Sequence, residues 1–377
     1  MIIKPDFYDK FECIAGECDF TCCKEWKIAV DDATASKWKN IAPPNGMKTR
    51  RKSLEQFTQY KEGMRVISLD EHICPFLNED RLCRLVVGYG DDVLSQTCQT
   101  FPREKHEYGS RVEYSLMPCC PAVVDLLDTA DAFRTIEIDS DEERQIVEKA
   151  EEEPKEHSGL WEIRQLLMDI LEDCNHSCEQ NLLVAFYANT ELYNDDNLTI
   201  ENVSSSIEQM HEAISAMSFD EGEHYAECHE LFLDLSENYR KQGLYKSYLS
   251  DVLNGVQQAD SIESYDTIFK QKWDEFQPLL HKYLVQEVYA DIMNVDSELD
   301  SMLIRLEWIG LEYTLIRHLC FGRFCADGNL DYKKVRDSIV LASRMMGYEE
   351  EDIYDYLENS FEDIIWQWGY FALVVGK

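Results

Sequence analysis

Cysteines are concentrated at the start of this chain, and that concentration limits what its first third can fold into. Nine of the fourteen cysteines lie within the first 120 of 377 residues. They are Cys13, Cys18, Cys22, Cys23, Cys74, Cys83, Cys98, Cys119 and Cys120. In a secreted protein such a set would indicate disulfides, whereas in a reducing compartment it indicates metal ligation or catalysis. The compartment therefore decides how the cysteines are interpreted.

The sequence favours the cytoplasm. Its opening, MIIKPDFYDKFEC, lacks the basic cluster and following apolar run of a secretory signal. No stretch of about 18 apolar residues occurs, so we expect no membrane span. We therefore expect a cytoplasmic protein whose reduced thiols bind a metal.

The spacing of the cysteines favours an iron–sulfur cluster over zinc. The blocks are CIAGECDFTCC, CPFLNEDRLC, LSQTC and MPCCP, and none contains the C-x2-C pair that is typical of structural zinc sites. Thiolates at irregular intervals on several loops suit a cluster. We predict a [4Fe–4S] cluster, with zinc as the alternative and a mixed or empty site as a third interpretation. Four thiolates complete one cluster, so eight or nine cysteines would serve two sites.

Two pairs of adjacent cysteines raise the question of which members are ligands. Cys119 and Cys120 would point in different directions in an extended segment, so we expect only one of them to bind the metal. The second cysteine of the Cys22–Cys23 pair raises the same question. The C-x3-C-x2-C motif of radical S-adenosylmethionine enzymes is absent, because Glu25 stands in its third position.

Charge is distributed unevenly along the chain, whose formal net charge is −38. Residues 1–125 carry 17 basic and 20 acidic side chains, whereas residues 126–377 carry 19 and 54. Such a field repels nucleic-acid phosphates and favours a basic target such as exposed lysines. A simple solubilising surface is an equal alternative. We expect no nucleic-acid partner.

Sequence periodicity divides the chain into three parts and predicts a mainly α fold. We predict a cysteine-rich, metal-binding domain with little β structure over residues 1–125 and an acidic helix and linker over 126–158. Residues 159–377 repeat the three/four spacing of buried helix faces, which predicts an all-α domain. Within the first part we expect a helix over 32–40, capped by Asp31 or Asp32, and a strand over 64–69 that pairs with 111–117.

Three groups in the helical part are weaker candidates for chemistry: Cys174, His176 and Cys178; His224, Cys228 and His229; and Arg317, His318, Cys320 and Cys325. We expect the first cysteine pair to lie on the apolar face of its helix and the second group to be solvated. The third group is expected to be core packing, with a helix end at Gly322.

The ordered cysteine blocks resemble the flagellin lysine-N-methylase family and, more loosely, cysteine-rich zinc/iron-chelating domains. The resemblance spans roughly residues 10–125 and is carried by CIAGECDFTCCKEW, CPFLNEDRLC, LSQTCQTFPR and SLMPCCPAV. It implies metal ligands at Cys13, Cys18, Cys22, Cys23, Cys74, Cys83, Cys98 and Cys120. Cys119 stands where the family tends to have a small polar residue, which supports Cys120 as the ligand. Arg81 stands where a glycine would be usual, in a turn.

The resemblance implies an enzyme that transfers methyl groups from S-adenosylmethionine to lysine side chains of flagellin. The sequence identifies neither catalytic nor donor-binding residues, but aromatic and acidic side chains of residues 159–377 are candidates for donor and lysine binding. Two other classes remain open: a non-catalytic metal-chelating or metal-delivery protein, and an interaction protein with a structural metal site. A methyltransferase predicts a deep cleft at the junction of the two halves.

Overall fold

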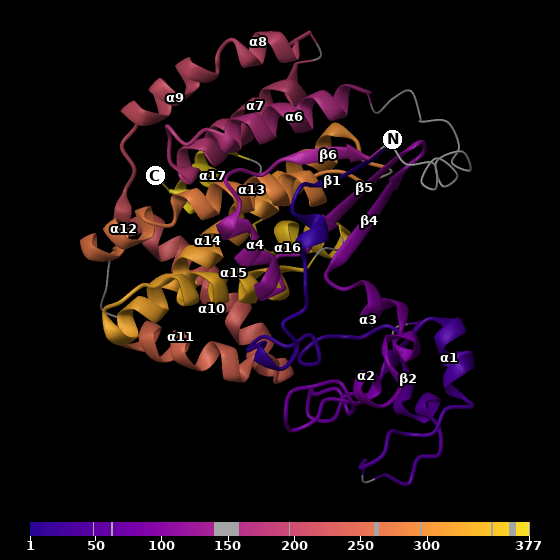
Figure 1. Cartoon of the computed structure of the whole chain (residues 1–377). Coiled ribbons are helices and arrows are strands. Elements are labelled where there is room, and N and C mark those ends of the chain that lie inside the picture. The colour runs from indigo at the N-terminus through magenta and orange to yellow at the C-terminus, as the bar shows by residue number, and fades with distance from the viewer. Residues whose placement is uncertain are drawn as a thin grey trace.

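Helices dominate the structure, as the sequence predicts (Figure 1). The structure is a computed structural model that describes residues 1–47, 49–61, 63–138, 158–195, 197–259, 264–294, 296–347, 350–361 and 367–376. No helix within these described ranges is both long enough and apolar enough to cross a membrane.

A four-stranded sheet of order β4-β5-β1-β6 joins the start of the chain to the residues that follow the cysteine blocks. Its strands are β1 (Ile2–Pro5), β4 (Arg103–Tyr108), β5 (Arg111–Leu116) and β6 (Thr135–Ile138). β1 is parallel to β5 and antiparallel to β6. The sheet therefore places Cys119 and Cys120, directly after β5, near the N-terminal loops.

The predicted pairing of residues 64–69 with 111–117 is wrong. β3 (Met64–Ile67) instead pairs with β2 (Thr58–Lys61), and β5 pairs with β4, the strand that directly precedes it. In both hairpins the partner is the neighbouring segment, which costs less loop-closure entropy than a distant one. Gly109, with φ of +59°, supplies the left-handed conformation that the short β4–β5 turn uses.

The cysteine-rich segment has a small core of its own, separate from the main core. The helices of this segment are η1 (Tyr8–Lys10), η2 (Ala15–Glu17), α1 (Asp32–Trp38), η3 (Leu54–Phe57), α2 (Arg84–Tyr89), η4 (Asp91–Val93) and α3 (Gln96–Thr100). Trp38 and Leu54 are fully buried in this core beside Phe57 and Phe76. The predicted helix α1 is confirmed, and Asp31 is its cap because its carboxylate accepts the backbone N–H of Thr34.

The remaining helices form one large assembly that shares its core with the sheet. They are α4 (Pro121–Thr129), α6 (Ser158–Glu172), α7 (Cys178–Asn194), α8 (Ile200–Ser204), α9 (Ile207–Ala216), α10 (Glu221–Gln242), α11 (Lys246–Ala259), α12 (Thr267–Asp274), α13 (Gln277–Asp291), α14 (Leu299–Asp327), α15 (Tyr332–Met346), α16 (Glu350–Phe361) and α17 (Trp368–Val375). The long helix α14 is buried along most of its length, so it forms the axis of this assembly.

The segment expected as an acidic helix and linker, residues 126–158, is only partly described. Its first residues belong to α4, and Thr135–Ile138 form β6 at the edge of the sheet. Residues 139–157 lie outside the described residues. Across this segment, the Arg164 guanidinium of α6 makes two hydrogen bonds, of 2.7 and 2.8 Å, to the Glu113 carboxylate of β5. This buried bidentate pair fixes the sheet against the helices.

The predicted helix end at Gly322 is wrong, because α14 continues to Asp327. Gly322 instead lies where α11 crosses α14 closely. A Cβ added to Gly255 of α11 would lie 1.8 Å from the Gly322 carbonyl oxygen. The absence of a side chain at Gly255 therefore lets α11 and α14 touch through their backbones.

Gly255→Ala is expected to lower the free energy of unfolding by about 1–3 kcal/mol or more, because the two helices must separate to admit the methyl group. Chemical denaturation would measure this loss. Gly159→Ala is the matched control, since a Cβ there meets nothing within 4 Å, and its effect should stay within about 1 kcal/mol. Equal stability of the two variants would contradict the backbone contact.

Candidate functional site

Cys23 lies at the centre of a group of thiols in the cysteine-rich segment. Hydrogen bonds from Cys22 and Cys74 lower the pKa of Cys23 to about 3, against the opposing effect of burial. The same contacts with Cys23, together with burial, raise the pKa of Cys22 and Cys74 well above the usual value. One thiolate held by two thiols shows that these three side chains converge, although 50 residues separate the blocks.

Cys83 and Cys98 also interact with Cys23. Burial is the largest cause of the raised pKa of Cys83, and Cys23 adds to it. Burial likewise raises the pKa of Cys98 to about 11, with further contributions from Cys23 and Cys83. Cys23, Cys74, Cys83 and Cys98 are therefore close enough to interact electrostatically. We name these four residues set one.

Cys13, Cys18 and Cys120 form a second group of interacting thiols, and Cys13 also interacts with Cys22. Burial raises the pKa of Cys120 to about 12, and Cys18 adds to this rise. Burial is the largest cause that raises the pKa of Cys18, and Cys13 adds to it. The hydrogen bond with Cys23 and then burial raise the pKa of Cys22, and Cys13 adds a smaller effect. We name Cys13, Cys18, Cys22 and Cys120 set two. Cys22 contacts both groups, because Cys23 and Cys98 of set one raise its pKa more than Cys13 does. Its assignment to set two leaves four thiols in each set.

Cys119 belongs to neither set. It is fully buried, and burial raises its pKa well above the usual value, with smaller effects from Arg344, Cys120, Glu104 and Glu287. Cys119 therefore interacts with Arg344 and these carboxylates, whereas Cys120, which packs in the main core, interacts with Cys18. That only one of the two cysteines binds the metal stays a prediction.

The thiol donors of the two sets suit zinc as well as an iron–sulfur cluster. Tetrahedral zinc with sulfur at about 2.3 Å holds its thiolates about 3.8 Å apart. Within the described part of the chain, which includes every cysteine, no three cysteine sulfurs lie within 4.8 Å of one another. The chemistry of the thiol donors fits both metals.

Arg344 of α15 connects the main assembly to the loops that carry set two. Its guanidinium donates to the backbone carbonyls of Phe20 at 2.7 Å, Cys119 at 2.9 Å and Thr21 at 3.3 Å. The side chain is buried, and among the described residues no carboxylate forms an ion pair with it. A buried cation without an anion is costly, so Arg344 suits an anionic thiolate centre beside it.

Arg81 lies in a turn whose backbone conformation favours glycine. Its φ is +60°, in the left-handed region that favours glycine. The side chain offsets this cost with a 3.0 Å ion pair to Asp19 and a 3.5 Å hydrogen bond to the Cys18 carbonyl. Arg81 thus connects the Cys74–Cys83 turn to the first cysteine block.

Four carboxyl groups gather where the sheet meets α13 and α14: Glu104, Glu287, Asp291 and Glu312. Burial is the main cause that raises their pKa values, to about 8 for Glu104, about 6 for Asp291 and about 7 for Glu312, and well above the usual range for Glu287. Repulsion from Asp291 adds to the shifts of Glu104, Glu287 and Glu312. We name these four residues the carboxyl cluster; the raised pKa values of Glu104, Asp291 and Glu312 lie near neutral pH.

A second buried polar network lies among α7, α10, α14 and the C-terminal helix α17. The Glu179 carboxylate accepts hydrogen bonds from Tyr313 at 2.6 Å, Trp273 at 3.1 Å and Arg317 at 3.3 Å. Burial alone would raise the pKa of Glu179, but the Arg317 charge and these hydrogen bonds outweigh it and lower the pKa. Arg317 also donates to the carbonyl of Val375 at 2.7 Å, which fixes the end of α17.

The expectation that His224 and Cys228 are solvated is wrong, because both are buried in this network. His224 accepts from Arg317 through Nε2 at 2.8 Å and donates from Nδ1 to the Leu373 carbonyl at 2.7 Å. Burial and then Arg317 lower the pKa of His224 to about 3, so the ring is neutral. The helix α17 covers this face, and a single sequence gives no signal for that contact.

Some of the other weak candidates are buried in the core, and others are exposed to solvent. Arg317, His318 and Cys320 are buried in α14, as core packing predicts. Cys178 is buried at the start of α7, but Cys174 is exposed in the preceding loop, so the expected apolar face holds only one of the two cysteines. His176 also lies in this loop.

An aromatic cavity of about 340 Å³ opens between α10, α14, α15 and α16. Its walls include Tyr239, Trp308 and Tyr356, with Met345 and Met346 of α15 beside them. The Trp308 indole donates to the Gly347 carbonyl at 3.2 Å and packs edge-on against Tyr356. The cavity therefore lies within the helical part, next to Arg344 along the chain, and not at the junction where we expected a cleft.

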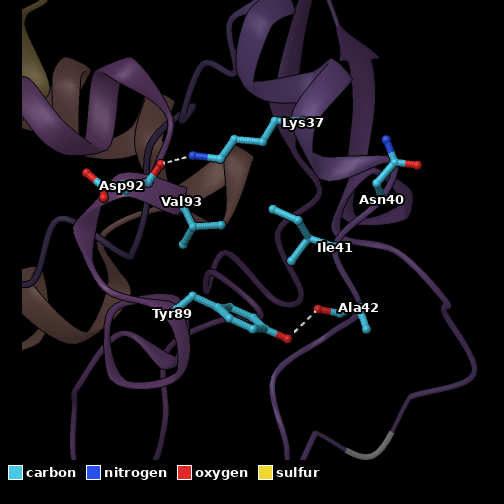
Figure 2. Close-up of a pocket in the computed structure, with 7 residues that line it drawn as sticks. All are labelled: Lys37, Asn40, Ile41, Ala42, Tyr89, Asp92 and Val93. Atoms are coloured by element: carbon cyan, nitrogen blue, oxygen red, sulfur yellow. Dashed lines mark hydrogen bonds between the residues drawn. The ribbon is translucent and has the colours of Figure 1, made fainter.

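A cavity of about 380 Å³ lies in the cysteine-rich segment and is lined by seven residues (Figure 2). Its polar side chains bind the backbone around it: Lys37 donates to the carbonyl of Asp92, and Tyr89 donates to that of Ala42 at 2.8 Å. These contacts connect the end of α1 to the loop after α2, so they stabilise the small core.

Comparison with known proteins identifies the family. Residues 164–374 match the sequence profile of the FliB lysine N-methylase C-terminal domain, over more than half of the chain. The chain belongs to the FliB lysine N-methylase family. No solved structure matches it significantly.

Individual relatives are similar to this FliB-family chain over about a third of its length. The flagellar biosynthetic protein FliU of Salmonella muenchen is 33% identical over 135 residues, which are 35% of this chain and 80% of FliU. Two proteins named lysine-N-methylase, from Salmonella typhimurium and Salmonella choleraesuis, are 33% and 34% identical over 135 and 136 residues. These segments cover 35% of this chain and 34% of each of those two proteins.

The FliB C-terminal domain coincides with the helical assembly from α6 to α17. It contains the Glu179–Arg317 network, the aromatic cavity and three members of the carboxyl cluster. All eight predicted cysteine ligands precede the domain in the sequence. Arg344, Tyr248 and Lys333 of this domain contact the loop that carries the first cysteine block.

Proposed function

We propose that this chain is a protein-lysine N-methyltransferase that transfers methyl groups from S-adenosylmethionine to lysines of flagellin. The match to the FliB C-terminal domain carries the proposal. Relatives named lysine-N-methylase and a flagellar biosynthetic protein support the reaction and the flagellar substrate. The strongly acidic chain, with 74 acidic and 36 basic side chains, suits a lysine-bearing target.

We further propose that each cysteine set holds one metal centre. Set one would use Cys23, Cys74, Cys83 and Cys98, and set two would use Cys13, Cys18, Cys22 and Cys120. A [4Fe–4S] cluster is the proposed group at each, with zinc as the alternative. The group would supply metal–sulfur bonds that hold the loops together, which adds folding free energy to a segment with a small core.

The aromatic cavity is the proposed donor site. A sulfonium ion is attracted to aromatic faces, and Tyr239, Trp308 and Tyr356 provide them. Asn238 and Gln242 add amide groups to its wall that suit hydrogen bonding to a nucleoside.

The carboxyl cluster is the proposed proton acceptor for the lysine. Glu104 and Asp291 are half-buried, whereas Glu287 and Glu312 are buried, so the first two form its accessible edge. Loss of a proton exposes the amine lone pair, which attacks the sulfonium methyl carbon. The carbon–sulfur bond breaks, its electron pair stays on sulfur as a thioether, and the methyl group ends on the lysine nitrogen.

Asn238→Arg is expected to weaken S-adenosylmethionine binding about tenfold or more, because it places a cation and a longer side chain at the cavity wall. Isothermal titration calorimetry would measure the affinity. Ala226→Arg is the matched control, since Ala226 is exposed on the same helix and does not line the cavity. Equal affinities for the two variants would place the donor elsewhere.

The proposed function is tested by incubating the purified, metal-loaded chain with S-adenosylmethionine and flagellin. Mass spectrometry should detect flagellin lysine peptides heavier by one methylene unit for each methyl transferred, and omission of the donor should abolish them. Unchanged flagellin from a metal-replete preparation would contradict the proposal.

A non-catalytic metal-chelating or structural protein is the second candidate. The exposed Cys13 favours it, because one edge of set two is open to solvent. A chelator or delivery protein would pass metal to an acceptor and leave flagellin unmodified, whereas a structural site would retain its metal against a competing chelator.

A further inference from the structure

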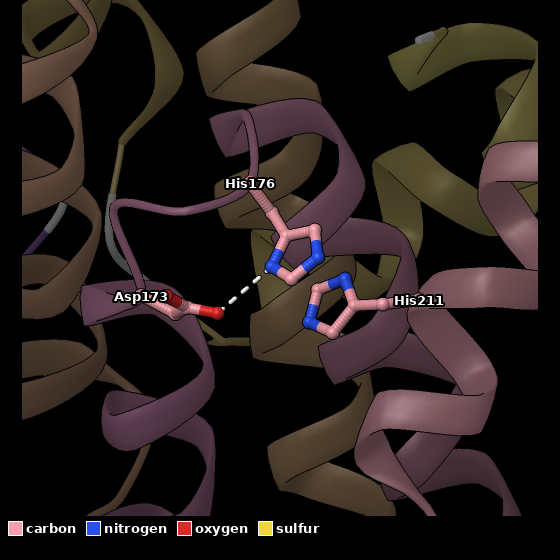
Figure 3. Close-up of side chains that lie close together, drawn as sticks. All are labelled: Asp173, His176 and His211. Atoms are coloured by element: carbon pink, nitrogen blue, oxygen red, sulfur yellow. Dashed lines mark hydrogen bonds and ion pairs between the residues drawn. The ribbon is translucent and has the colours of Figure 1, made fainter.

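Two histidines and an aspartate converge outside the cysteine-rich segment, where the α6–α7 loop meets α9 (Figure 3). Asp173 and His176 lie in or beside the loop, and His211 lies on α9. A potential ligand atom from each lies within 4.8 Å of the others. His176 Nδ1 is 2.8 Å from the Asp173 carboxylate, and the two imidazole rings stack with centroids 3.7 Å apart.

His211 has no partner that explains its position. Only 2% of the residue is exposed, and both ring nitrogens lack a hydrogen bond within the described part of the chain. A buried polar group without a partner costs about 1–3 kcal/mol. A neutral imidazole offers one lone pair, so a cation is the ligand that would satisfy it.

The surrounding charges also suit a cation. Burial is the main cause that lowers the pKa of His211, whereas the negative charges of Asp173 and Glu208 act to raise it. Glu208 precedes His211 by three residues on α9 and therefore lies on the same helix face. Two carboxylates thus accompany two imidazoles at this point.

We propose that Asp173, His176 and His211 bind a divalent transition-metal cation. Two imidazole nitrogens and one carboxylate oxygen suit zinc, cobalt or nickel, whereas calcium and magnesium prefer oxygen alone. Three protein ligands leave a fourth position for water or for Glu208. The inference does not depend on the proposed methyl transfer.

The cation would hold α9 against the loop between α6 and α7. Both imidazole lone pairs lie in their ring planes, and the planes are only 9° apart, so one ring must turn to share an ion. Ser177 caps α7 directly after His176 and keeps the loop in place. Cation binding would therefore stabilise the helical assembly and leave the cysteine sets unchanged.

Cobalt titration of the full chain, with its cysteine-bound metal already in place, tests the proposal. We expect one further equivalent of Co²⁺ to bind with the weak visible bands of nitrogen and oxygen ligands and without a new thiolate charge-transfer band. We also expect it to raise the melting temperature. Loss of a residue that only hydrogen-bonds a metal ligand typically weakens metal binding about 10- to 100-fold. Asp173→Asn and His211→Ala remove direct ligands and should weaken Co²⁺ binding by more than that.

Glu172→Gln is the matched control, since this exposed carboxylate is next to Asp173 and outside the group. It should bind Co²⁺ like the unaltered chain. Asp173→Asn keeps the side-chain volume, so its folding is checked by its melting temperature without metal. Equal Co²⁺ binding by Asp173→Asn and the unaltered chain, or no additional equivalent in either, would overturn the proposal.

Discussion

Cys120→Ser is expected to remove the metal of set two, whereas Cys119→Ser leaves the metal content unchanged. Cys120 interacts with Cys18, but Cys119 is fully buried and faces Arg344, Glu104 and Glu287. A serine hydroxyl is a poor replacement for a thiolate at a soft metal. Metal and sulfide analysis of the two purified variants would measure the difference. The Cys120→Ser variant should contain half as much metal as the Cys119→Ser variant.

Cys98→Ser provides the reciprocal experiment, because Cys98 belongs to set one. It should remove the other half of the metal, and the Cys98→Ser/Cys120→Ser double variant should lose both centres. Equal metal content of the Cys119→Ser and Cys120→Ser variants would contradict the assignment. Complete loss after either Cys98→Ser or Cys120→Ser would indicate one shared centre.

Arg317→Met is expected to lower the free energy of unfolding by about 3–5 kcal/mol, because it leaves the buried Glu179 carboxylate without its cation. The variant also loses the hydrogen bonds from Arg317 to His224 and Val375, which attach α10 and α17 to α14. Chemical denaturation at neutral pH would measure the loss. The exposed pair of Lys272 and Glu275 is the control, since Lys272→Met should cost at most about 1 kcal/mol.

The pH dependence gives the Arg317 prediction an independent readout. The pKa of Glu179 is lower in the folded chain than usual, so the pair stabilises the fold above the unfolded carboxyl pKa of about 4.3. This contribution is lost as the pH falls through the lower folded pKa. The difference in stability between the unaltered chain and Glu179→Gln/Arg317→Met should therefore shrink in acid. A difference that stays constant with pH would contradict an ionised pair.

The sequence predicts local features of this fold well. The three/four spacing of apolar residues identifies helices such as α6 and α10, which bury one face, whereas α13 and α14 are buried on all sides. Asp31 and Asp32 are both recognisable as caps of α1, because they precede a run of helix formers, and the structure selects Asp31. The adjacent cysteines of MPCCP imply different orientations, and Cys119 and Cys120 interact with different groups.

Long-range contacts escape the same reasoning. The apolar alternation of residues 64–67 predicts a strand but does not identify β2 as its partner. Gly322 is typical of a helix end, but α14 continues through it to Asp327. The sequence does not show that Gly255 of α11 packs against the Gly322 carbonyl. Arg344 and Glu179 resemble ordinary surface residues in the sequence. Their burial depends on which segments pack against them, namely the cysteine loops and α14.

The division of eight cysteines into two sets of four is the central claim about the candidate site. Anaerobic purification of the unaltered chain, followed by iron, sulfide and zinc analysis with absorption spectroscopy, tests it most directly. Two [4Fe–4S] clusters predict about eight iron and about eight sulfide ions per chain, with broad thiolate-to-iron absorption. About half that iron content at full occupancy, or zinc without sulfide, would contradict two iron–sulfur centres.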